Sequence, residues 1–129
     1  MKNGKLTITG GTFSDNSIYN TTDIIHGGSV INLNNKATLD IRSAKNADGT
    51  ITQPTFSNNS SAARGGVIYI ESSATFADDV TNVSYNYGTA TAIIRGGIFE
   101  NNSVLEDANS ITYGGAIAMY DGNAVVVIG

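Results

Sequence analysis

Short runs in which apolar and polar residues alternate recur along the whole chain. One of them reads Ala37-Thr38-Leu39-Asp40-Ile41. A period of two is typical of a β-strand with one buried face, because successive side chains point to opposite sides. No stretch has the apolar spacing of an amphipathic helix, so the pattern predicts an all-β protein. Strands are expected at Lys5–Thr9, Ser29–Leu33, Ala37–Ile41, Val67–Glu71, Ala92–Arg95, Ala116–Tyr120 and Ala124–Ile128.

An internal repeat organises these strands. The motif Phe-x-x-Asn-Ser begins at Phe13, Phe56 and Phe99, with a spacing of 43 residues both times. Three of the four Phe residues of the chain lie in this motif, so chance explains it poorly. A period of this length is typical of solenoids. It divides one predicted β-helix domain, residues 1–129, into repeats near 13–55, 56–98 and 99–129.

Two further elements follow each Phe motif. The first is a Gly-Gly pair, which occurs at Gly27-Gly28, Gly65-Gly66 and Gly114-Gly115. The second reads Ala37-Thr38-Leu39, Ala74-Thr75-Phe76 and Ala124-Val125-Val126. The distance from Phe to the Gly pair is 14, 9 and 15 residues. Recurrent short strands with loops of variable length between them are typical of a coiled solenoid.

The fold predicted from these repeats is a right-handed, single-stranded parallel β-helix. Strands this short are weak alone, but stacked about 4.8 Å apart they bond to the rungs above and below. Since a rung takes roughly 20 or more residues, each repeat is expected to form two rungs and the chain about six. The next rungs are expected in neighbouring sequence, so we interpret the chain as a fragment of a longer solenoid.

Each motif residue has an expected structural role in that coil. The Phe side chains point inward at one corner, two rungs apart. The Asn residues occupy the following turn, where their amides can bond to the backbone and to neighbouring rungs. The Gly pairs let the backbone bend into the next strand. These structural residues are Phe13, Asn16, Gly27, Gly28, Phe56, Asn59, Gly65, Gly66, Phe99, Asn102, Gly114 and Gly115.

The position of Asn32 conflicts with this arrangement. Counted from the Gly pairs, Asn32 aligns with Ile70 and Met119, which should face the interior. Either Asn32 is buried with hydrogen-bond partners, or its strand slips by one residue.

The low charge of the chain narrows the classes of partner. Charged residues make up 14% of the sequence, and the net charge is −4. The seven basic residues are scattered along the sequence, which disfavours nucleic acid and an anionic membrane surface. No segment approaches transmembrane length, so no direct membrane insertion is expected. The apolar run Val125-Val126-Val127-Ile128 predicts end-to-end self-association through an uncovered edge.

Candidate catalytic groups are few. Asp78-Asp79 and Glu106-Asp107 are paired acids, and His26 is the one histidine of a chain that lacks cysteine. A solvated turn explains each acidic pair, and a lone His without a carboxylate set makes no metal site. We therefore expect no catalytic, cofactor-binding or metal site, and no cofactor.

Tyrosines are the candidates for a binding surface. Tyr69 lies between Ile68 and Ile70, so it is expected to face outward. Exposed aromatic side chains can stack on sugars or anchor a protein partner. The alternative is that they only cover their neighbours on a solvated sheet. The binding-surface candidates are Tyr69, Tyr85 and Tyr87, with protruding loops at Ser43–Thr50 and Asn82–Thr89.

The pair Phe-x-x-Asn and Gly-Gly-x-[Ile/Val] resembles the repeat of the chlamydial polymorphic outer membrane proteins and of adhesin-like surface proteins. Members are autotransporters or surface proteins whose β-helical passengers mediate adhesion. The resemblance implies a non-catalytic, secreted or surface-exposed adhesin segment of a bacterium or archaeon, associated with the outer membrane. Its partner would be a protein or glycan of a host or microbial surface. Two alternatives stay open: a fragment of a carbohydrate-active β-helix similar to pectate lyases, and a spacer stalk.

Overall fold

The computed structural model describes residues 1, 3–19, 27–34, 36–62, 64–71, 76–77, 84–85, 89–105, 114–120 and 125–128. Within these residues the chain forms strands, turns and bends. The first turn of the coil contains β1 (Asn3–Ile8), β2 (Thr12–Ser14), β3 (Ser17–Ile18) and β4 (Ile31–Asn34). The second contains β5 (Lys36–Arg42), β8 (Thr55–Ser57), β9 (Ser60–Ser61) and β10 (Ile68–Glu71). The third contains β13 (Thr91–Arg95), β14 (Ile98–Glu100), β15 (Ser103–Val104) and β16 (Ile117–Tyr120).

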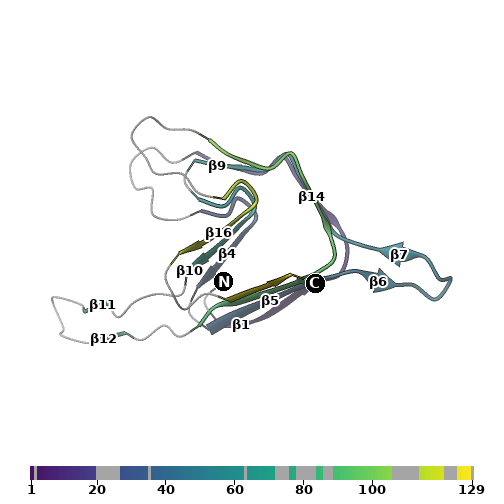
Figure 1. Ribbon diagram of the computed structural model, residues 1–129, viewed down its shortest axis with the longest axis horizontal. Helices are drawn as coiled ribbons and strands as arrows, with labels where there is room; N and C mark the ends of the chain where they lie inside the picture. The colour runs from purple at the N-terminus through teal and green to yellow at the C-terminus, as the bar shows by residue number, and fades with distance from the viewer. Residues whose placement is uncertain are drawn as a thin grey trace.

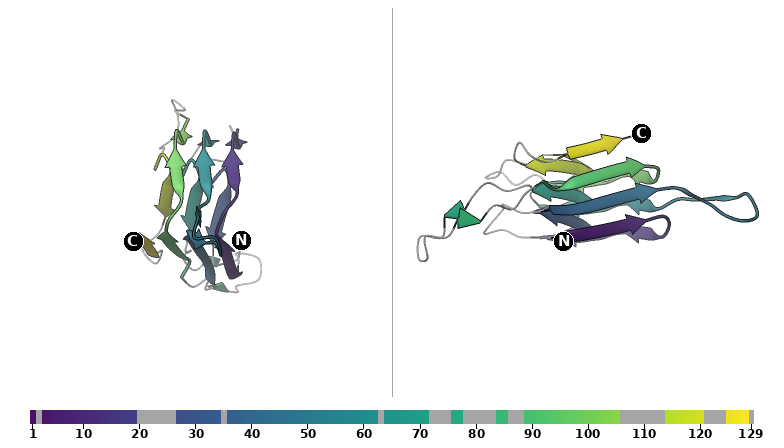
Figure 2. Two further views of the ribbon diagram at one scale, coloured as in Figure 1. Left: turned by 90° about the vertical axis from the view of Figure 1, so that its right-hand side faces the viewer. Right: turned by 90° about the horizontal axis from the view of Figure 1, so that it is seen from below.

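Equivalent strands of successive turns stack in parallel. The sheet orders are β1-β5-β13-β17, β2-β8-β14, β3-β9-β15 and β4-β10-β16, where β17 (Val125–Ile128) adds a fourth strand to the first sheet. Figure 1 looks along the stack, and Figure 2 shows the three turns lying side by side. The all-β, solenoid-like arrangement of stacked parallel strands is thus as predicted from the sequence.

Two antiparallel excursions leave the coil. The strands β6 (Ala44–Lys45) and β7 (Ile51–Thr52) pair as one hairpin, and β11 (Phe76–Ala77) and β12 (Ser84–Tyr85) pair as another. Both project away from the stacked sheets in Figure 1. They lengthen the chain within a turn without adding a turn to the coil.

Each 43-residue repeat forms one turn. Phe56 pairs directly with Phe13 on one side and with Phe99 on the other. The ring centroids lie 4.9 Å and 4.7 Å apart, and the rings are tilted by 11° and 15°. The expectation of two rungs per repeat and about six in all is therefore wrong. It assumed a compact turn, whereas the β6–β7 and β11–β12 hairpins take up part of the extra length.

The Asn32 conflict is resolved by a slip of one residue. Asn32 pairs with Tyr69, and Leu33 pairs with Ile70, so Leu33 faces the interior. Of the two alternatives stated for Asn32, the slipped strand is the correct one. The first Gly-Gly pair is offset by one relative to the others, because the left-handed residue is Gly28 there but Gly65 in the next turn (φ 77° and 61°).

The expectation that Phe76 belongs to a strand equivalent to the one at Leu39 is wrong. Thr38 of β5 pairs with Thr91 of β13, so β13 continues that sheet. Phe76, from the expected Ala74-Thr75-Phe76 element, lies instead in the β11–β12 hairpin. A match of three residues is too short to distinguish a strand of the coil from an insertion.

The interior is a narrow apolar core. It consists of Ile8, Ile31, Leu33, Ala37, Leu39, Ile41, Phe56, Val67, Ile68, Ile70, Ala90, Ala92 and Ile94. In β5 the inward positions Ala37, Leu39 and Ile41 are fully buried, as the alternation predicted. Burying a Leu, Ile or Phe side chain contributes roughly 1.5–3 kcal/mol, so the middle turn, covered on both sides, contributes most. At the outer turns Leu6 and Met119 stay 37% and 48% exposed.

Candidate binding surfaces

The three motif asparagines form a hydrogen-bonded ladder along the stacked turns, and its middle member is buried. Asn59 is fully buried, and its Nδ2 donates to Oδ1 of Asn102 and to the carbonyl oxygen of Phe13, both at 2.9 Å. Its Oδ1 accepts from Nδ2 of Asn16 at 2.9 Å. Asn102 repeats the pattern, with Nδ2 donating to the Phe56 carbonyl at 2.8 Å. These bonds satisfy the buried amide of Asn59 and tie adjacent turns together, so the ladder has a structural role.

The residue before each ladder asparagine adopts a left-handed conformation. Asp15, Asn58 and Asn101 have φ values of 58°, 56° and 53°. Asp and Asn tolerate this region better than other residues with a Cβ, which explains why only these two types occur there. All three are exposed, so they form a column along one outer edge of the coil.

The glycine pairs have a packing role. A Cβ at Gly28, Gly65 or Gly114 would overlap the carbonyl oxygen of Ile31, Ile68 or Ile117, respectively. The three φ values, 77°, 61° and 66°, also lie in the left-handed region. Three turns therefore repeat one tight entry into the β4-β10-β16 sheet, and this entry excludes any side chain.

The expectation that Tyr69 is exposed is wrong. Its side chain is fully buried, although it points to the opposite side of β10 from Ile68 and Ile70. Nη1 of Arg64 donates to the Tyr69 hydroxyl at 3.3 Å. Alternation fixes the side of a strand on which a residue lies, but not whether another segment covers that side. Tyr69 therefore cannot contribute to a binding surface. The other two candidates, Tyr85 and Tyr87, have side chains that the structure does not describe.

The β6–β7 hairpin forms an ordered projection where the sequence predicted a loop at Ser43–Thr50. Asn46 N–H donates to the Thr50 carbonyl at 2.8 Å, and Gly49 N–H donates to the Asn46 carbonyl at 3.0 Å. Oδ1 of Asp48 accepts from the Thr50 hydroxyl at 2.6 Å and from Thr50 N–H at 2.9 Å. The hydroxyl bond is the main cause that lowers the pKa of Asp48. Ile51 follows with 67% of its surface exposed, so the projection presents an apolar residue.

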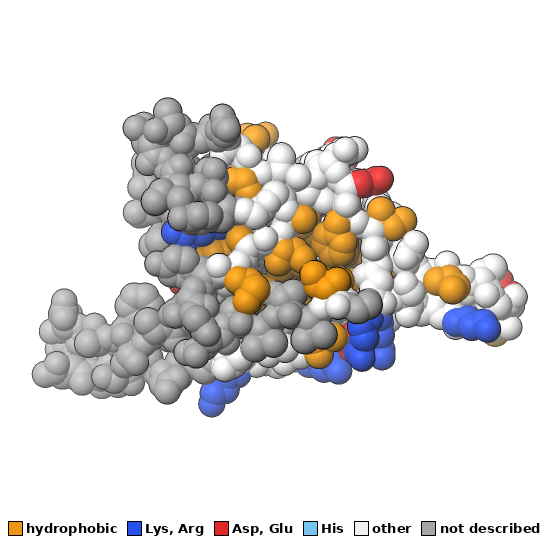
Figure 3. Space-filling model, viewed as in Figure 1, with side chains coloured by type: hydrophobic (Ala, Val, Ile, Leu, Met, Phe, Trp, Pro, Cys, Tyr) orange, Lys and Arg blue, Asp and Glu red, His pale blue; other side chains and the backbone are white. Residues whose placement is uncertain are grey.

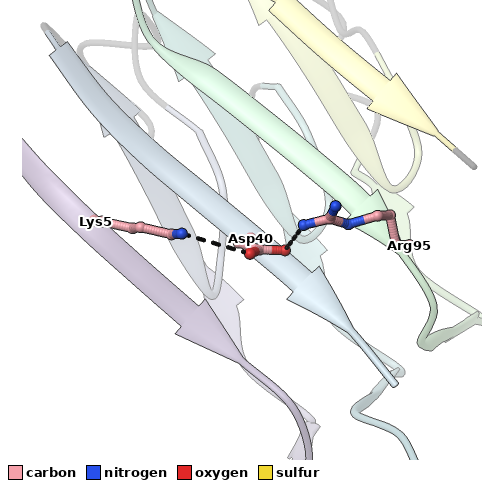
Figure 4. Close-up of polar contacts among 3 residues, drawn as sticks. All are labelled: Lys5, Asp40 and Arg95. Carbon is pink, nitrogen blue, oxygen red and sulfur yellow. Dashed lines mark hydrogen bonds and ion pairs between the residues drawn. The ribbon is translucent and has the colours of Figure 1, made fainter. Parts of the chain in front are cut away.

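A charged cluster lies on the outer side of the four-stranded sheet. Asp40 on β5 is 2% exposed, while its partners Lys5 on β1 and Arg95 on β13 are 62% and 53% exposed. Nη2 of Arg95 lies 3.0 Å from one carboxylate oxygen, and Nζ of Lys5 lies 3.7 Å from the other. Figure 4 shows the carboxylate held between the two cations from the neighbouring strands.

The environment of Asp40 favours its ionised form. The hydrogen bond from Arg95 is the largest cause that lowers its pKa, burial opposes it, and the charges of Arg95, Arg42 and Lys5 lower it further. Because both partners are more than half exposed, solvent screens these attractions strongly. An ionised, ion-paired carboxylate is suited to holding strands together and poorly suited to general acid catalysis. The alternation placed Asp40 on this side, but only the strand register reveals its partners.

The fold also gathers basic residues that are scattered in the sequence. Arg42 pairs with Arg95 in the register of β5 and β13, and Lys36 begins β5 on the same side. Figure 3 shows basic side chains along the lower edge of the molecule and on the β6–β7 hairpin, where Lys45 lies. The charged side chains on the outer side of β1, β5 and β13 are therefore predominantly basic, in a chain whose net charge is −4.

The remaining chemical candidates lie outside the described part. These are His26, Asp78, Asp79, Glu106 and Asp107. Among the described residues, no three His, Cys, Asp or Glu side chains come close enough to hold a metal ion. The same residues include no helix with the length and hydropathy needed to cross a membrane.

Residues 55–71 match the repeat of the Chlamydia polymorphic membrane protein family. The matched segment runs from β8 to β10 and contains Phe56, Asn59 and the Gly65-Gly66 pair. The chain carries a polymorphic-membrane-protein-type repeat. This repeat forms the corner where the aromatic stack and the asparagine ladder lie. No curated protein and no solved structure matches the chain.

Proposed function

We propose that this chain is a non-catalytic segment of a surface-exposed or secreted adhesin of a bacterium or archaeon. The observation that carries the proposal is the match of residues 55–71 to a repeat of outer-membrane surface proteins. The motif residues of the other two repeats stack on that segment in register. The same repeat type therefore builds the whole coil.

The architecture suits attachment to another surface. In a right-handed parallel β-helix the sheets form flat faces along one axis. The right-handed sense is supported by the path of the chain, which runs counter-clockwise as it advances toward the viewer in Figure 1. The motif side chains contact one another between turns, which leaves the outer faces and the projections for recognition. The β6–β7 hairpin and the basic face are the described features most open to a protein or glycan partner.

A spacer stalk is the second candidate. It is favoured by the ladder and the aromatic stack, because these bonds hold turns together and need no ligand. A spacer would keep a binding region away from the cell, and its own faces would bind nothing. The two functions therefore differ in a measurable property of this chain.

Attachment of the purified 129-residue chain to cells tests the proposal. Beads carrying the chain should attach saturably to cultured epithelial cells or to other bacteria, and free chain should compete. Beads carrying the Phe56→Ala variant, in which the coil is destabilised, serve as the control for folded structure. Circular dichroism should first show that the chain is folded. If neither the beads nor the free chain then attaches to any tested cell, the adhesin function is rejected in favour of the spacer function.

A further inference from the structure

The outer face of the β1-β5-β13 sheet segregates charge. Lys5, Lys36, Arg42 and Arg95, four of the seven basic residues of the chain, lie on these strands. Their one acidic residue is Asp40, whereas the chain contains 11 acidic residues. In β5 the inward positions are Ala37, Leu39 and Ile41, so the charged positions point outward.

Arg42 and Arg95 lie opposite one another on adjacent strands. Like charges at opposed positions of a sheet destabilise it. Asp40 compensates Arg95 directly, through the 3.0 Å ion pair. Arg42 is exposed, and the described ion pairs of Asp40 are to Arg95 and Lys5 only. The donors of Arg42 therefore face solvent beside a second guanidinium, an arrangement that an external anion would stabilise.

We propose that this face binds a linear anionic polysaccharide, one that carries sulfate or uronate groups. Arg42 and Arg95 hold one anionic group between them, since paired guanidinium groups match carboxylate and sulfate oxygens. The inference rests on the proposed adhesin function, because such a ligand lies at the surface of another cell. It names the chemistry of the partner.

The basic positions follow a line that suits an extended ligand. Lys36 and Arg42 are six residues apart on β5, about 20 Å at the rise of a strand. Lys45 lies three residues further, at the base of the β6–β7 hairpin. Thr38 and Thr91 occupy outward positions between these cations, and their hydroxyl groups can bond to sugar hydroxyls.

Other polyanions fit the face less well. Nucleic-acid binding depends on many phosphate contacts, and single strands are usually held by stacking on aromatic side chains. The described outward positions of β1, β5 and β13 carry no aromatic residue. A membrane-binding surface needs a denser basic cluster next to apolar anchors. A thin polysaccharide requires only spaced cations and hydroxyl groups.

Affinity measurements on the 129-residue chain test the proposal. The probes are size-matched fragments of heparin, hyaluronan and neutral dextran, with duplex DNA and phosphatidylserine vesicles as competing classes. We expect binding to heparin or hyaluronan and none to dextran, with affinity falling as salt rises. Arg42→Gln should weaken binding about tenfold, the effect of losing one charge-assisted hydrogen bond. It should change the melting temperature little, because the lost repulsion between Arg42 and Arg95 offsets the lost attraction between Arg42 and Asp40.

Asn101→Asp is the matched control. It changes the net charge by the same amount as Arg42→Gln, but at the exposed edge position where the first repeat already has Asp15. Its affinity should stay within about twofold of the parent. Equal losses in the two variants, equal binding to dextran, or preference for DNA or vesicles would overturn the proposal. Cell attachment that survives Arg42→Gln would reject this ligand and leave the adhesin function standing.

Discussion

The side-chain amide of Asn59 donates to Oδ1 of Asn102 at 2.9 Å across 43 residues of sequence. Asn59 also accepts from Asn16, so its amide connects three turns of the coil. The bond repeats because the turns repeat. The hydrogen bond between Asn59 and Asn102 can therefore form only when the turns of the coil are stacked.

Replacing Asn59 with Ala should destabilise the coil by about 3 kcal/mol, because the Phe13 carbonyl and Asn102 Oδ1 lose their donor in a buried place. Urea unfolding followed by circular dichroism measures the change. Asn58→Gly is the neighbouring control. Its exposed position has φ 56°, which Gly adopts freely, so its effect should stay under about 0.5 kcal/mol. Similar losses in the two variants would contradict a structural ladder.

The aromatic stack should depend most on its middle member. Phe56 is fully buried between two rings, whereas Phe13 and Phe99 are half-buried. Phe56→Ala should cost about 3–5 kcal/mol, and Phe13→Ala clearly less, because its site already meets solvent. Thermal and urea unfolding of both variants give the order. A larger loss at Phe13 would show that the stack does not lie within a common core.

Gly65→Ala should be strongly destabilising. The new Cβ would overlap the Ile68 carbonyl oxygen, in addition to the strain of φ 61°. Gly49→Ala isolates the backbone term, because φ there is 86° and no atom lies within 4 Å of the added Cβ. We expect about 1–2 kcal/mol or less for Gly49→Ala, and a clearly larger loss for Gly65→Ala. If Gly65→Ala and Gly49→Ala have similar free energies of unfolding, the close approach of Gly65 to the Ile68 carbonyl does not restrict the residue type there.

Stability should fall in acid partly through Asp40. Its pKa in the folded chain lies below the ordinary value of 3.8, chiefly because of the bond from Arg95. Its stabilising contribution is therefore complete above the unfolded pKa and is lost as pH falls through the lower, folded pKa. Unfolding free energies measured from about pH 6 to pH 2 should fall more steeply for the parent than for Asp40→Asn. Parallel pH profiles would mean that the ion pairs add no net stability.

The 129-residue chain should self-associate. Within the described strands, β17 pairs with β13 on one side only, and Ile128 is 73% exposed. Exposed apolar edges of sheets promote pairing between copies. Sedimentation velocity over a dilution series should show oligomers that Ile128→Lys reduces. A monomer at every concentration would refute this prediction.

The sequence alone predicted the strands well, because alternation reports directly on burial. Each of the seven expected strands overlaps an observed one. It predicted the number of turns poorly, since residue spacing does not separate coil from hairpin. Thr38 and Thr91 lie 53 residues apart and still pair, because an excursion intervenes.

The candidate surfaces were harder to predict than the core. The burial of Tyr69 depends on which segment covers the outer side of its strand, and that is a tertiary property. The cluster of Lys5, Asp40 and Arg95 depends on strand register, because its members come from three turns. The three residue types are ordinary at outward positions, so no local signal distinguishes them.

At one corner of the coil, chain segments of very different length connect the β1-β5-β13-β17 sheet to the β2-β8-β14 sheet. Two residues connect Arg95 to Ile98, whereas twelve connect Arg42 to Thr55 and form the β6–β7 hairpin. Both segments deliver the next strand to the same register against its neighbour. Segments of unrelated sequence could therefore be exchanged at this corner while the interior stays unchanged. The segment at this corner can therefore vary in length and sequence without any change to the stacked strands.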